Sequence, residues 1–214
     1  MTGPAWIERL ERRLGWAAVP GLASFLIGMN AAVWALALLK PEFPELLALD
    51  PTLVARGQLW RLATFLFIPP PLSPFWMFFW LYLLFMYART LETEWGDFRF
   101  NLFYGIGAAA TIAASLTLGR QLSNVALNAS LFLAFAAIYP DFELLLLFVL
   151  PVKVKWLAAL AWMGIGWGLL AGDWDRRAAT LAGVANYLVF FGPGHWERGR
   201  QAWRSWRFKR RMGG

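Results

Sequence analysis

The feature that most constrains this chain is a series of long stretches without Asp, Glu, Lys or Arg. They are residues 14–39, 62–88, 100–119, 121–140, 156–172 and 178–196. A helix that crosses a membrane needs about 17–25 mainly apolar residues, and each stretch approaches or exceeds that length. The composition agrees, because 59% of the residues are hydrophobic and only 15% are charged, whereas soluble domains carry about 25% charged residues. We therefore predict an integral membrane protein with six spans.

The spans divide the chain into an all-α membrane domain, residues 1–192, and a basic, aromatic tail, residues 193–214. The expected span cores are residues 18–39, 75–90, 101–118, 123–139, 156–172 and 178–192. The proline-rich residues 68–74 cannot continue a helix, because proline lacks the backbone donor, so the second span should begin near Pro74. Residues 144–150 are too short to cross and are expected to form an interfacial or re-entrant piece.

The distribution of Lys and Arg predicts that both termini are cytoplasmic. Residues 1–17, the second-to-third and fourth-to-fifth connections and the tail share one side, and this side carries more Lys and Arg than the other. Cytoplasmic segments are enriched in these residues. The tail decides the balance, because without it the two sides are nearly equal. The preference for Arg over Lys, together with abundant Ala, Leu and Trp, is typical of a high-GC bacterial coding sequence, so we expect the bacterial inner membrane.

Two absences limit the chemistry that the sequence predicts. The chain has no cysteine, which excludes disulfides, thiolate metal sites and cysteine nucleophiles. No Asp or Glu falls within the expected span cores, and ionisable groups at membrane depth usually mark proton relays and ion pathways. Proton-coupled transport is therefore disfavoured, and we predict neither a cofactor nor a metal site.

The first long connection contains Trp60-Arg61, followed by an apolar run that ends at Pro69. We interpret this as a segment lying half in the outer leaflet, with the Arg61 guanidinium bonding to loop carbonyls and the Trp60 indole at headgroup depth. The alternative is a simple aromatic anchor beside an arginine that extends to the membrane surface.

The second connection contains Leu91-Glu92-Thr-Glu-Trp95-Gly96-Asp-Phe-Arg99-Phe100. With the preceding Trp-Arg loop and six spans in this order, the chain resembles the rhomboid superfamily from about Gly57 to Tyr187. The resemblance implies a six-helix bundle with cytoplasmic termini. It also assigns structural roles to a set of motif residues: Trp60, Arg61, Glu92, Trp95, Gly96, Arg99 and Gly183.

The same resemblance locates the positions where a rhomboid protease carries its catalytic groups. Ser130, in Asn128-Ala-Ser-Leu131, matches the nucleophile, but both flanking glycines are replaced. Thr180 occupies the position of the histidine base, and Trp76 and Trp80 stand where the oxyanion-hole histidine and asparagine are expected. A serine hydroxyl is a weak nucleophile without an adjacent base. We therefore predict a protein without protease activity.

No other residue is expected to supply the base. His195 is the chain's one histidine, and it and the lysines Lys153 and Lys155 fall on the predicted cytoplasmic side, whereas Lys40 closes the first span. Ser130 is then a packing hydroxyl. Small residues should allow close helix approach: Gly105, Gly107, Ala109, Ala179 and Gly183. Other polar side chains should bond between helices: Thr111, Ser115, Asn124, Asn128 and Asn186.

The tail alternates arginines with aromatic residues. We expect its rings to enter the headgroup layer and its cations to bind anionic lipid, and the membrane anchor favours lipid over nucleic acid, which the same composition also suits. The lipid-binding candidates are Arg200, Trp203, Arg204, Trp206, Arg207 and Arg210.

The leading hypothesis from sequence is a catalytically inactive, rhomboid-like membrane protein, in the broad sense that includes derlin-like members, which binds transmembrane segments of client proteins. The main alternative is an active intramembrane serine protease that uses Ser130 with a non-standard base. A third class, a channel or a scaffold without clients, stays open.

Overall fold

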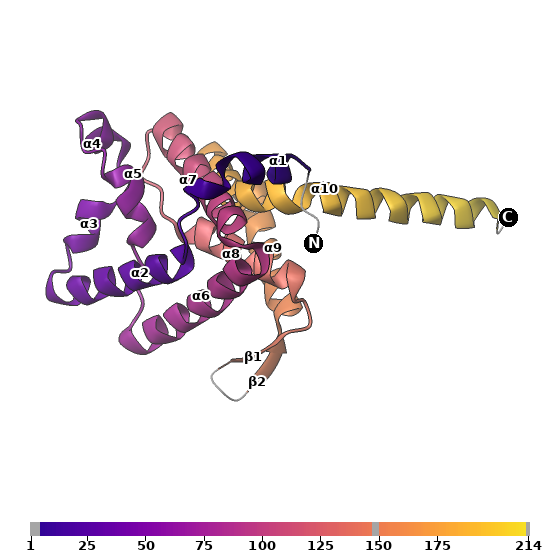
Figure 1. Ribbon diagram of the computed structural model, residues 1–214, viewed down its shortest axis with the longest axis horizontal. Helices are drawn as coiled ribbons and strands as arrows, with labels where there is room; N and C mark the ends of the chain where they lie inside the picture. Colours follow the sequence, from indigo (N-terminus) through magenta and orange to yellow (C-terminus); the bar gives the residue numbers. More distant parts are fainter. Residues whose placement is uncertain (1–4, 147–149, 213–214) are drawn as a thin grey trace.

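The computed structural model describes residues 5–146 and 150–212, and this part of the chain is mostly helical (Figure 1). The longer helices are α1 (Ala5–Leu14), α2 (Leu22–Leu39), α6 (Pro74–Trp95), α7 (Asp97–Leu118), α8 (Val125–Ile138), α9 (Val154–Ala171) and α10 (Trp174–Met212). The first long connection holds the short helices α3 (Phe43–Leu47), α4 (Pro51–Ala55) and α5 (Arg61–Thr64). One hairpin joins β1 (Glu143–Leu146) to β2 (Leu150–Lys153).

In residues 5–146 and 150–212, three helices, not the six predicted, are long and apolar enough to cross a membrane. They are α2, α7 and α9. The six predicted span positions do coincide with helices, so the error lies in their length and polarity rather than in their location. α8 has 14 residues and is about 21 Å long, shorter than a hydrocarbon core of about 30 Å.

The other two predicted spans, in α6 and in the first part of α10, are long enough but less apolar. α6 contains three tryptophans and two tyrosines, whose rings carry polar groups, and Arg89 lies in its C-terminal half. The first part of α10 begins with Asp175 and two arginines and continues with Asn186. Both helices therefore carry charged or polar residues in or beside the predicted spans. These residues make them less apolar than α2, α7 and α9.

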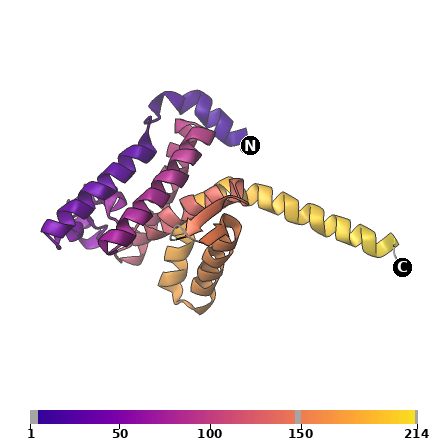
Figure 2. The ribbon, with the colours of Figure 1, turned by 90° about the horizontal axis from the view of Figure 1, so that it is seen from below.

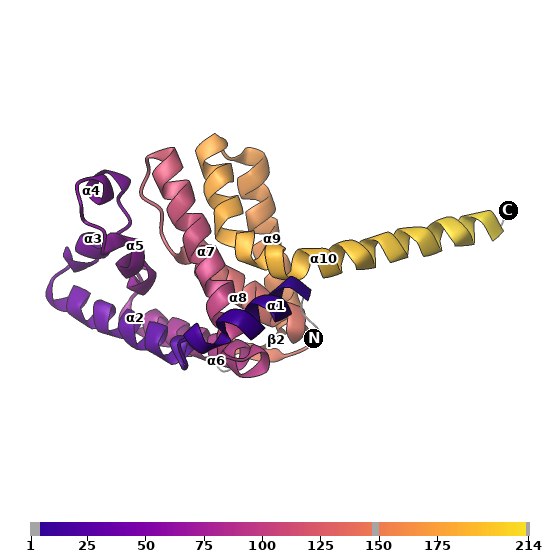
Figure 3. The same ribbon diagram turned by 45° about the horizontal axis from the view of Figure 1, so that its top comes forward.

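The centre of the molecule is formed by α7, α8 and α10, with α6 packed on α8 and α2 packed on α6 (Figures 1 and 3). The main buried cluster draws on all these helices and includes Leu84, Phe103, Leu131 and Val184. α9 packs beside α8 and α10 but contributes little buried surface, since only Val154 at its start is buried. The helices thus differ strongly in how well they are packed.

The four segments that the distribution of Lys and Arg assigns to one side of the membrane lie at the same end of the bundle. Arg99, at the start of α7, pairs with Glu11 of α1 at 2.8 Å, and Trp6 of α1 contacts Phe190 of α10 edge-on. Tyr139, after α8, donates to Glu94 at the end of α6 at 2.6 Å. The opposite end holds the first long connection and the ion pair of Arg120 with Asp175.

The predicted interfacial piece at residues 144–150 is not a re-entrant segment in the part that the structure describes. Its described residues, 144–146 and 150, belong to the antiparallel hairpin, in which Glu143 pairs with Lys153. α10 is one helix from Trp174 to Met212, so the predicted tail continues the sixth predicted span (Figure 2). Pro193 lies inside this helix, and beyond the bundle α10 projects away from the other elements (Figure 3). A proline inside a helix removes a hydrogen bond and kinks the helix.

Candidate functional site

The hydroxyl of Ser130 lies at the centre of the bundle, on α8, with 0% of the residue exposed. Its Oγ donates to the carbonyl oxygen of Leu127 in the preceding turn at 2.6 Å. The amide Nδ2 of Asn186, on α10, donates to the same Oγ at 2.7 Å. The hydroxyl proton therefore points to a backbone carbonyl, and the neighbouring side chain is a donor rather than a base.

Small residues make this contact between Ser130 and Asn186 possible. Gly107 of α7 lies against the two helices so closely that an added Cβ would meet the side chains of Leu127 and Asn186. On α10, an added Cβ at Gly183 would meet Ala126 of α8. Both glycines were predicted to allow close helix approach, and the structure confirms that role. Gly105 has open space instead, since its Cβ would meet nothing within 4 Å.

Thr180 does not lie beside Ser130. Its Oγ1 donates to the carbonyl of Arg176 on its own helix at 2.7 Å. Thr180 precedes Asn186 by six residues, which is about 9 Å along a helix axis. It lines a separate cavity of ≈ 380 Å³ between α8, α9 and α10. The residue that meets Ser130 is thus one to two turns further along α10 than the position that the rhomboid resemblance implies.

The two tryptophans at the expected oxyanion positions differ in their surroundings. Trp76 is exposed and contacts Phe75 and Phe79 of its own helix edge-on. Trp80 packs against the main buried cluster and lines a cavity of ≈ 310 Å³ together with Asn128. Of the two indoles, Trp80 lines this cavity, whereas Trp76 is not among its lining residues.

The prediction for Arg61 is confirmed, because its guanidinium bonds to loop carbonyls. Nη1 donates to the carbonyls of Glu45 and Ala48, each at 2.8 Å, and Nε donates to Gln58 at 2.7 Å. Arg61 is 5% exposed, whereas the neighbouring Trp60 is exposed. The arginine thus joins α5 to α3 and to the residues before and after α4, because each buried carbonyl needs a donor.

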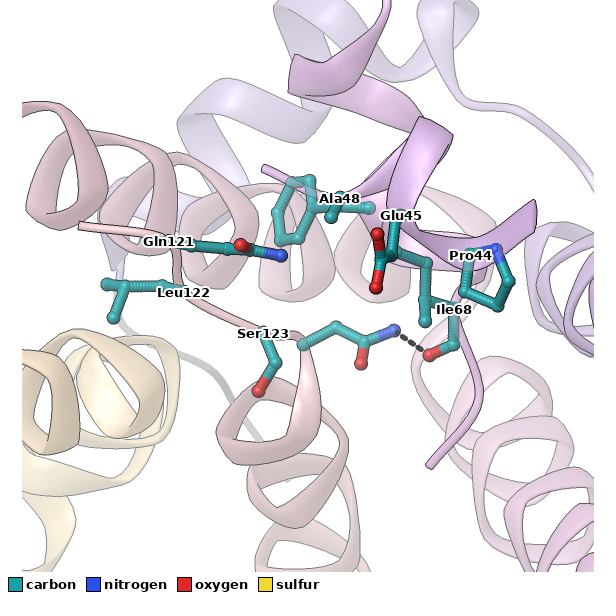
Figure 4. Close-up of a pocket in the computed structure, with 9 residues that line it drawn as sticks. Pro44, Glu45, Ala48, Ile68, Gln121, Leu122 and Ser123 are labelled. Carbon is teal, nitrogen blue, oxygen red and sulfur yellow. Dashed lines mark hydrogen bonds between the residues drawn. The ribbon is translucent and has the colours of Figure 1, made fainter. Parts of the chain in front are cut away.

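The largest of the cavities described here, ≈ 500 Å³, lies between this first connection and the loop before α8 (Figure 4). Its polar lining is Glu45, Gln121, Ser123 and Asn124. Asn124 donates to the carbonyls of Leu66 at 2.9 Å and Ile68 at 3.0 Å, and the second of these bonds is drawn in Figure 4. Asn124 was expected to bond between helices; its two bonds instead fasten the first connection to the start of α8.

The residues of the Leu-Glu motif bind α1, α2 and α10 to the end of α6. Glu92 is 2% exposed; its Oε1 accepts from the backbone N–H of Ala23 at 3.1 Å, and its Oε2 pairs with Arg89 at 2.6 Å. A carboxylate at the first turn of α2 compensates the free N–H groups and the positive end of the helix dipole.

The rest of that motif forms the turn between α6 and α7. Gly96 has φ 79°, a left-handed conformation that favours glycine. Trp95 stacks on Phe190 of α10 with ring centroids 5.9 Å apart and contacts Phe103 of α7 at 5.3 Å. Arg99 binds Glu11 through two nitrogens, at 2.8 and 2.9 Å. The motif residues are therefore structural in this protein.

Other polar residues form fewer bonds between helices than expected. Thr111 donates to Gly107 on its own helix, and Ser115 donates to Arg120 at the end of the same helix. Asn128 is buried, and its Nδ2 has no hydrogen-bond partner among the residues that the structure describes. Thr111 and Ser115 thus satisfy their hydroxyls locally, as Ser and Thr in helices often do.

The lysines that were considered as alternative bases for Ser130 pair with a carboxylate. Lys153 and Lys155 both pair with Asp141, at 3.8 and 2.6 Å. His195 lies on α10 beyond the bundle, and its side chain is outside the described part. Among the described residues no group of three His, Cys, Asp or Glu side chains is placed to hold a metal ion.

The tail candidates belong to the projecting part of α10. Arg200 and Trp203 are exposed, whereas the side chains of Arg204, Trp206, Arg207 and Arg210 lie outside the described part. Comparison of the chain with protein families and with curated proteins finds no match.

Proposed function

We propose that this chain is a rhomboid-like membrane protein without protease activity that binds transmembrane segments of other proteins. One observation carries the proposal: the Ser130 hydroxyl donates to a backbone carbonyl and accepts from an amide. Serine catalysis requires an acceptor that takes the hydroxyl proton and returns it. Neither bond of Ser130 supplies one, so the polar pair at this position is better suited to joining helices than to catalysis.

The apolar surface of α9 supports the binding of membrane segments. Its exposed large side chains are Trp156, Leu160, Trp162, Met163, Trp167 and Leu170. Gly164 and Gly166 on the same helix have open space around the position of a Cβ. Small residues let two helices approach closely in lipid, where packing rather than water exclusion drives association. A transmembrane segment of a client can therefore pack on this face.

In this proposal the protein resides in the bacterial inner membrane with both termini in the cytoplasm. The end of the bundle that carries α1, the α6–α7 turn and the β hairpin then faces the cytoplasm, and α10 extends from that end. The alternating arginines and tryptophans of its projecting part bind anionic lipid rather than nucleic acid, because each cation near such a surface adds about 1 kcal/mol.

The experiment is site-specific photocrosslinking in the native membrane. A photoreactive amino acid replaces Met163 on α9, and a matched control replaces Leu38 on α2; both positions are exposed to about 60%. We expect the Met163 position to capture membrane proteins several-fold more than the Leu38 position. Equal capture at both positions contradicts the proposal, and capture of only a second copy of the chain favours a scaffold without clients.

A further inference from the structure

The cavity of ≈ 380 Å³ between α8, α9 and the first part of α10 has an almost continuous apolar wall. Ile165, Trp167 and Val184 contribute larger apolar side chains to it. Half of its ten lining residues are small, so they leave room between the three helices: Ala126, Ala129, Ala161, Gly164 and Gly168. An apolar group can therefore be accommodated between these helices.

Among the described residues, Arg176 is the one charged residue that lines this cavity. The residue is exposed, and its side chain lies against Gly172 at the end of α9, where an added Cβ would meet Cδ of Arg176 at 3.0 Å. Its backbone N–H donates to Asp173 at 3.0 Å. Its guanidinium, in contrast, has no hydrogen bond or ion pair with any residue that the structure describes.

The charged neighbours of Arg176 have partners of their own. Arg177 donates to the carbonyl of Leu170 at 3.1 Å and thereby caps the end of α9. Asp175 pairs with Arg120 at 2.8 Å. Of the two adjacent arginines at the start of α10, Arg177 thus has a structural bond, whereas the guanidinium of Arg176 is available to a group from outside the described protein.

A guanidinium beside an apolar wall matches a ligand with an apolar chain and one anionic end. Guanidinium binds a carboxylate through two parallel hydrogen bonds. The hydroxyl of Thr180, which also lines the cavity, already donates to the carbonyl of Arg176 at 2.7 Å. Thr180 therefore has no proton left for an ester carbonyl, which favours a carboxylate attached directly to the chain over a phospholipid.

The charge of Arg176 also favours a lipid over a protein segment as the occupant. An ionised Asp or Glu in a transmembrane segment is costly and therefore rare. A fatty acid, in contrast, always carries its charge at the end of an apolar chain. It thus offers both features that the cavity and Arg176 match.

We propose that this cavity binds a long-chain fatty acid, whose carboxylate pairs with Arg176 while its chain lies between α8, α9 and α10. Burial of the chain supplies most of the affinity, and the exposed arginine supplies the preference for an anion. The cavity shares Gly164 and Trp167 with the α9 face on which client capture is proposed. The fatty-acid site does not depend on that capture, because its test requires only the purified protein and the ligand.

The test compares two ligands that differ in the charge of one end. Purified protein in a non-ionic detergent at about pH 9, where a carboxyl group is ionised, is labelled with a photoreactive analogue of oleate. Oleate or oleyl alcohol is then added as a competitor. An ion pair at an exposed arginine corresponds to an affinity ratio of up to about five-fold. We expect oleate to displace the analogue at an about two- to five-fold lower concentration than oleyl alcohol, and equal displacement overturns the proposal.

Two pairs of variants locate the carboxylate and the chain. In Arg176→Gln we expect oleate and oleyl alcohol to compete equally, whereas Arg56→Gln, which removes an exposed arginine of the first connection, should keep the preference. Gly164→Leu should weaken both ligands because it fills the cavity. Gly166→Leu should not, since this position also has open space but does not line the cavity. A preference for oleate that persists in Arg176→Gln, or full binding in Gly164→Leu, contradicts the assignment.

Other occupants are distinguished in the same assay. Dioleoyl phosphatidylglycerol and a hydrophobic transmembrane peptide are each added as a competitor to the labelled wild type. Displacement by oleate at the lowest concentration supports the proposal. Displacement at a lower concentration by the phospholipid or by the peptide assigns the cavity to that class of ligand and overturns the proposal.

Discussion

The contact between α8 and α10 and the exposed face of α9 show two different uses of an apolar helix. At the first, Ser130, Asn186 and Gly107 are enclosed, and each polar atom that joins the helices has a partner. In α9, only 6% of the most apolar stretch of 18 residues is buried inside the protein, whereas 28% of the corresponding stretch of α7 is buried. Polar side chains are thus paired where α7, α8 and α10 pack tightly, whereas Gly164 and Gly166 of α9 lie among large exposed apolar groups and have open space around them.

This difference shows how Ser130, which the proposed rhomboid likeness aligns with a nucleophile, can serve as a packing group instead. When the base is absent, the hydroxyl still bonds between helices, because a buried donor and acceptor must be satisfied. Ser130 and Asn186 satisfy one another while Gly107 provides the space. The large exposed apolar side chains of α9 belong to a different helix from this pair.

The largest expected loss of stability comes from placing a large side chain in the tight contact between α7, α8 and α10. In Gly107→Leu the new side chain meets Leu127 and Asn186, so we expect the free energy of unfolding in detergent to fall by about 3 kcal/mol or more. The matched control is Gly166→Leu on α9, where an added Cβ meets nothing within 4 Å. We expect that control to stay near wild type. Similar losses in the two variants would show that α9 is packed as tightly as α10.

The next effect concerns the polar pair. Ser130→Ala leaves Nδ2 of Asn186 buried without its acceptor, which costs about 1–3 kcal/mol. Adding Asn186→Leu removes the unpaired group, so the double variant should lose less than the sum of the single variants. A double-mutant cycle in detergent measures this coupling. Strict additivity would mean that the bond between Ser130 and Asn186 contributes nothing to stability.

A smaller effect is expected from the exposed face. Trp167→Ala and Met163→Ala on α9 remove large side chains that make few contacts inside the protein, so stability should change by no more than about 0.5 kcal/mol. Client capture at α9 should nevertheless decrease, since these side chains supply the contact area. Parallel measurement of unfolding and of crosslinking separates the two results. A stability loss near that of Gly107→Leu would place this face inside the fold.

The smallest expected effect is a pH dependence in the stability of the β1–β2 hairpin, which precedes α9. The Lys155 ammonium, which donates to Asp141 at 2.6 Å, holds the pKa of that carboxyl below its usual value of 3.8. Because the pKa is lower in the folded state, the bond stabilises the hairpin above the usual pKa, and this contribution is lost as the pH falls through the lowered value. Hydrogen exchange of the β1 and β2 amides should therefore accelerate over this acidic range, measured relative to the chemical exchange rate. Asp141→Asn should remove the dependence.

Much of the fold follows from local patterns. Stretches without charge located the helices, as in the predicted core 18–39 and the observed α2 at Leu22–Leu39, because apolar periods and prolines act over a few residues. The Arg61 bonds were also predictable, since a buried guanidinium must find acceptors nearby. The number of spans was overestimated, because absence of charge does not measure the cost of tryptophan, tyrosine and asparagine in a helix.

The candidate site was harder to predict, because it depends on how helices rotate against one another. Asn186 was recognised as a residue that can bond between helices, but nothing local indicates that Ser130, 56 residues away, is its partner. One signal was present: Asn186 lies three residues after Gly183, on the same face of α10. The exposure of Trp76 likewise depends on the orientation of α6, which the sequence spacing does not give.

The most direct test of the central claim is whether Ser130 reacts with an electrophile that labels activated serines. Purified wild-type protein is incubated with a fluorophosphonate, and its intact mass is compared with that of Ser130→Ala treated in the same way, with an active serine hydrolase as the positive control. The bonds of Ser130 to Leu127 and Asn186 predict no adduct on either form of this protein. A phosphonyl adduct on the wild type that is absent from Ser130→Ala would contradict the account.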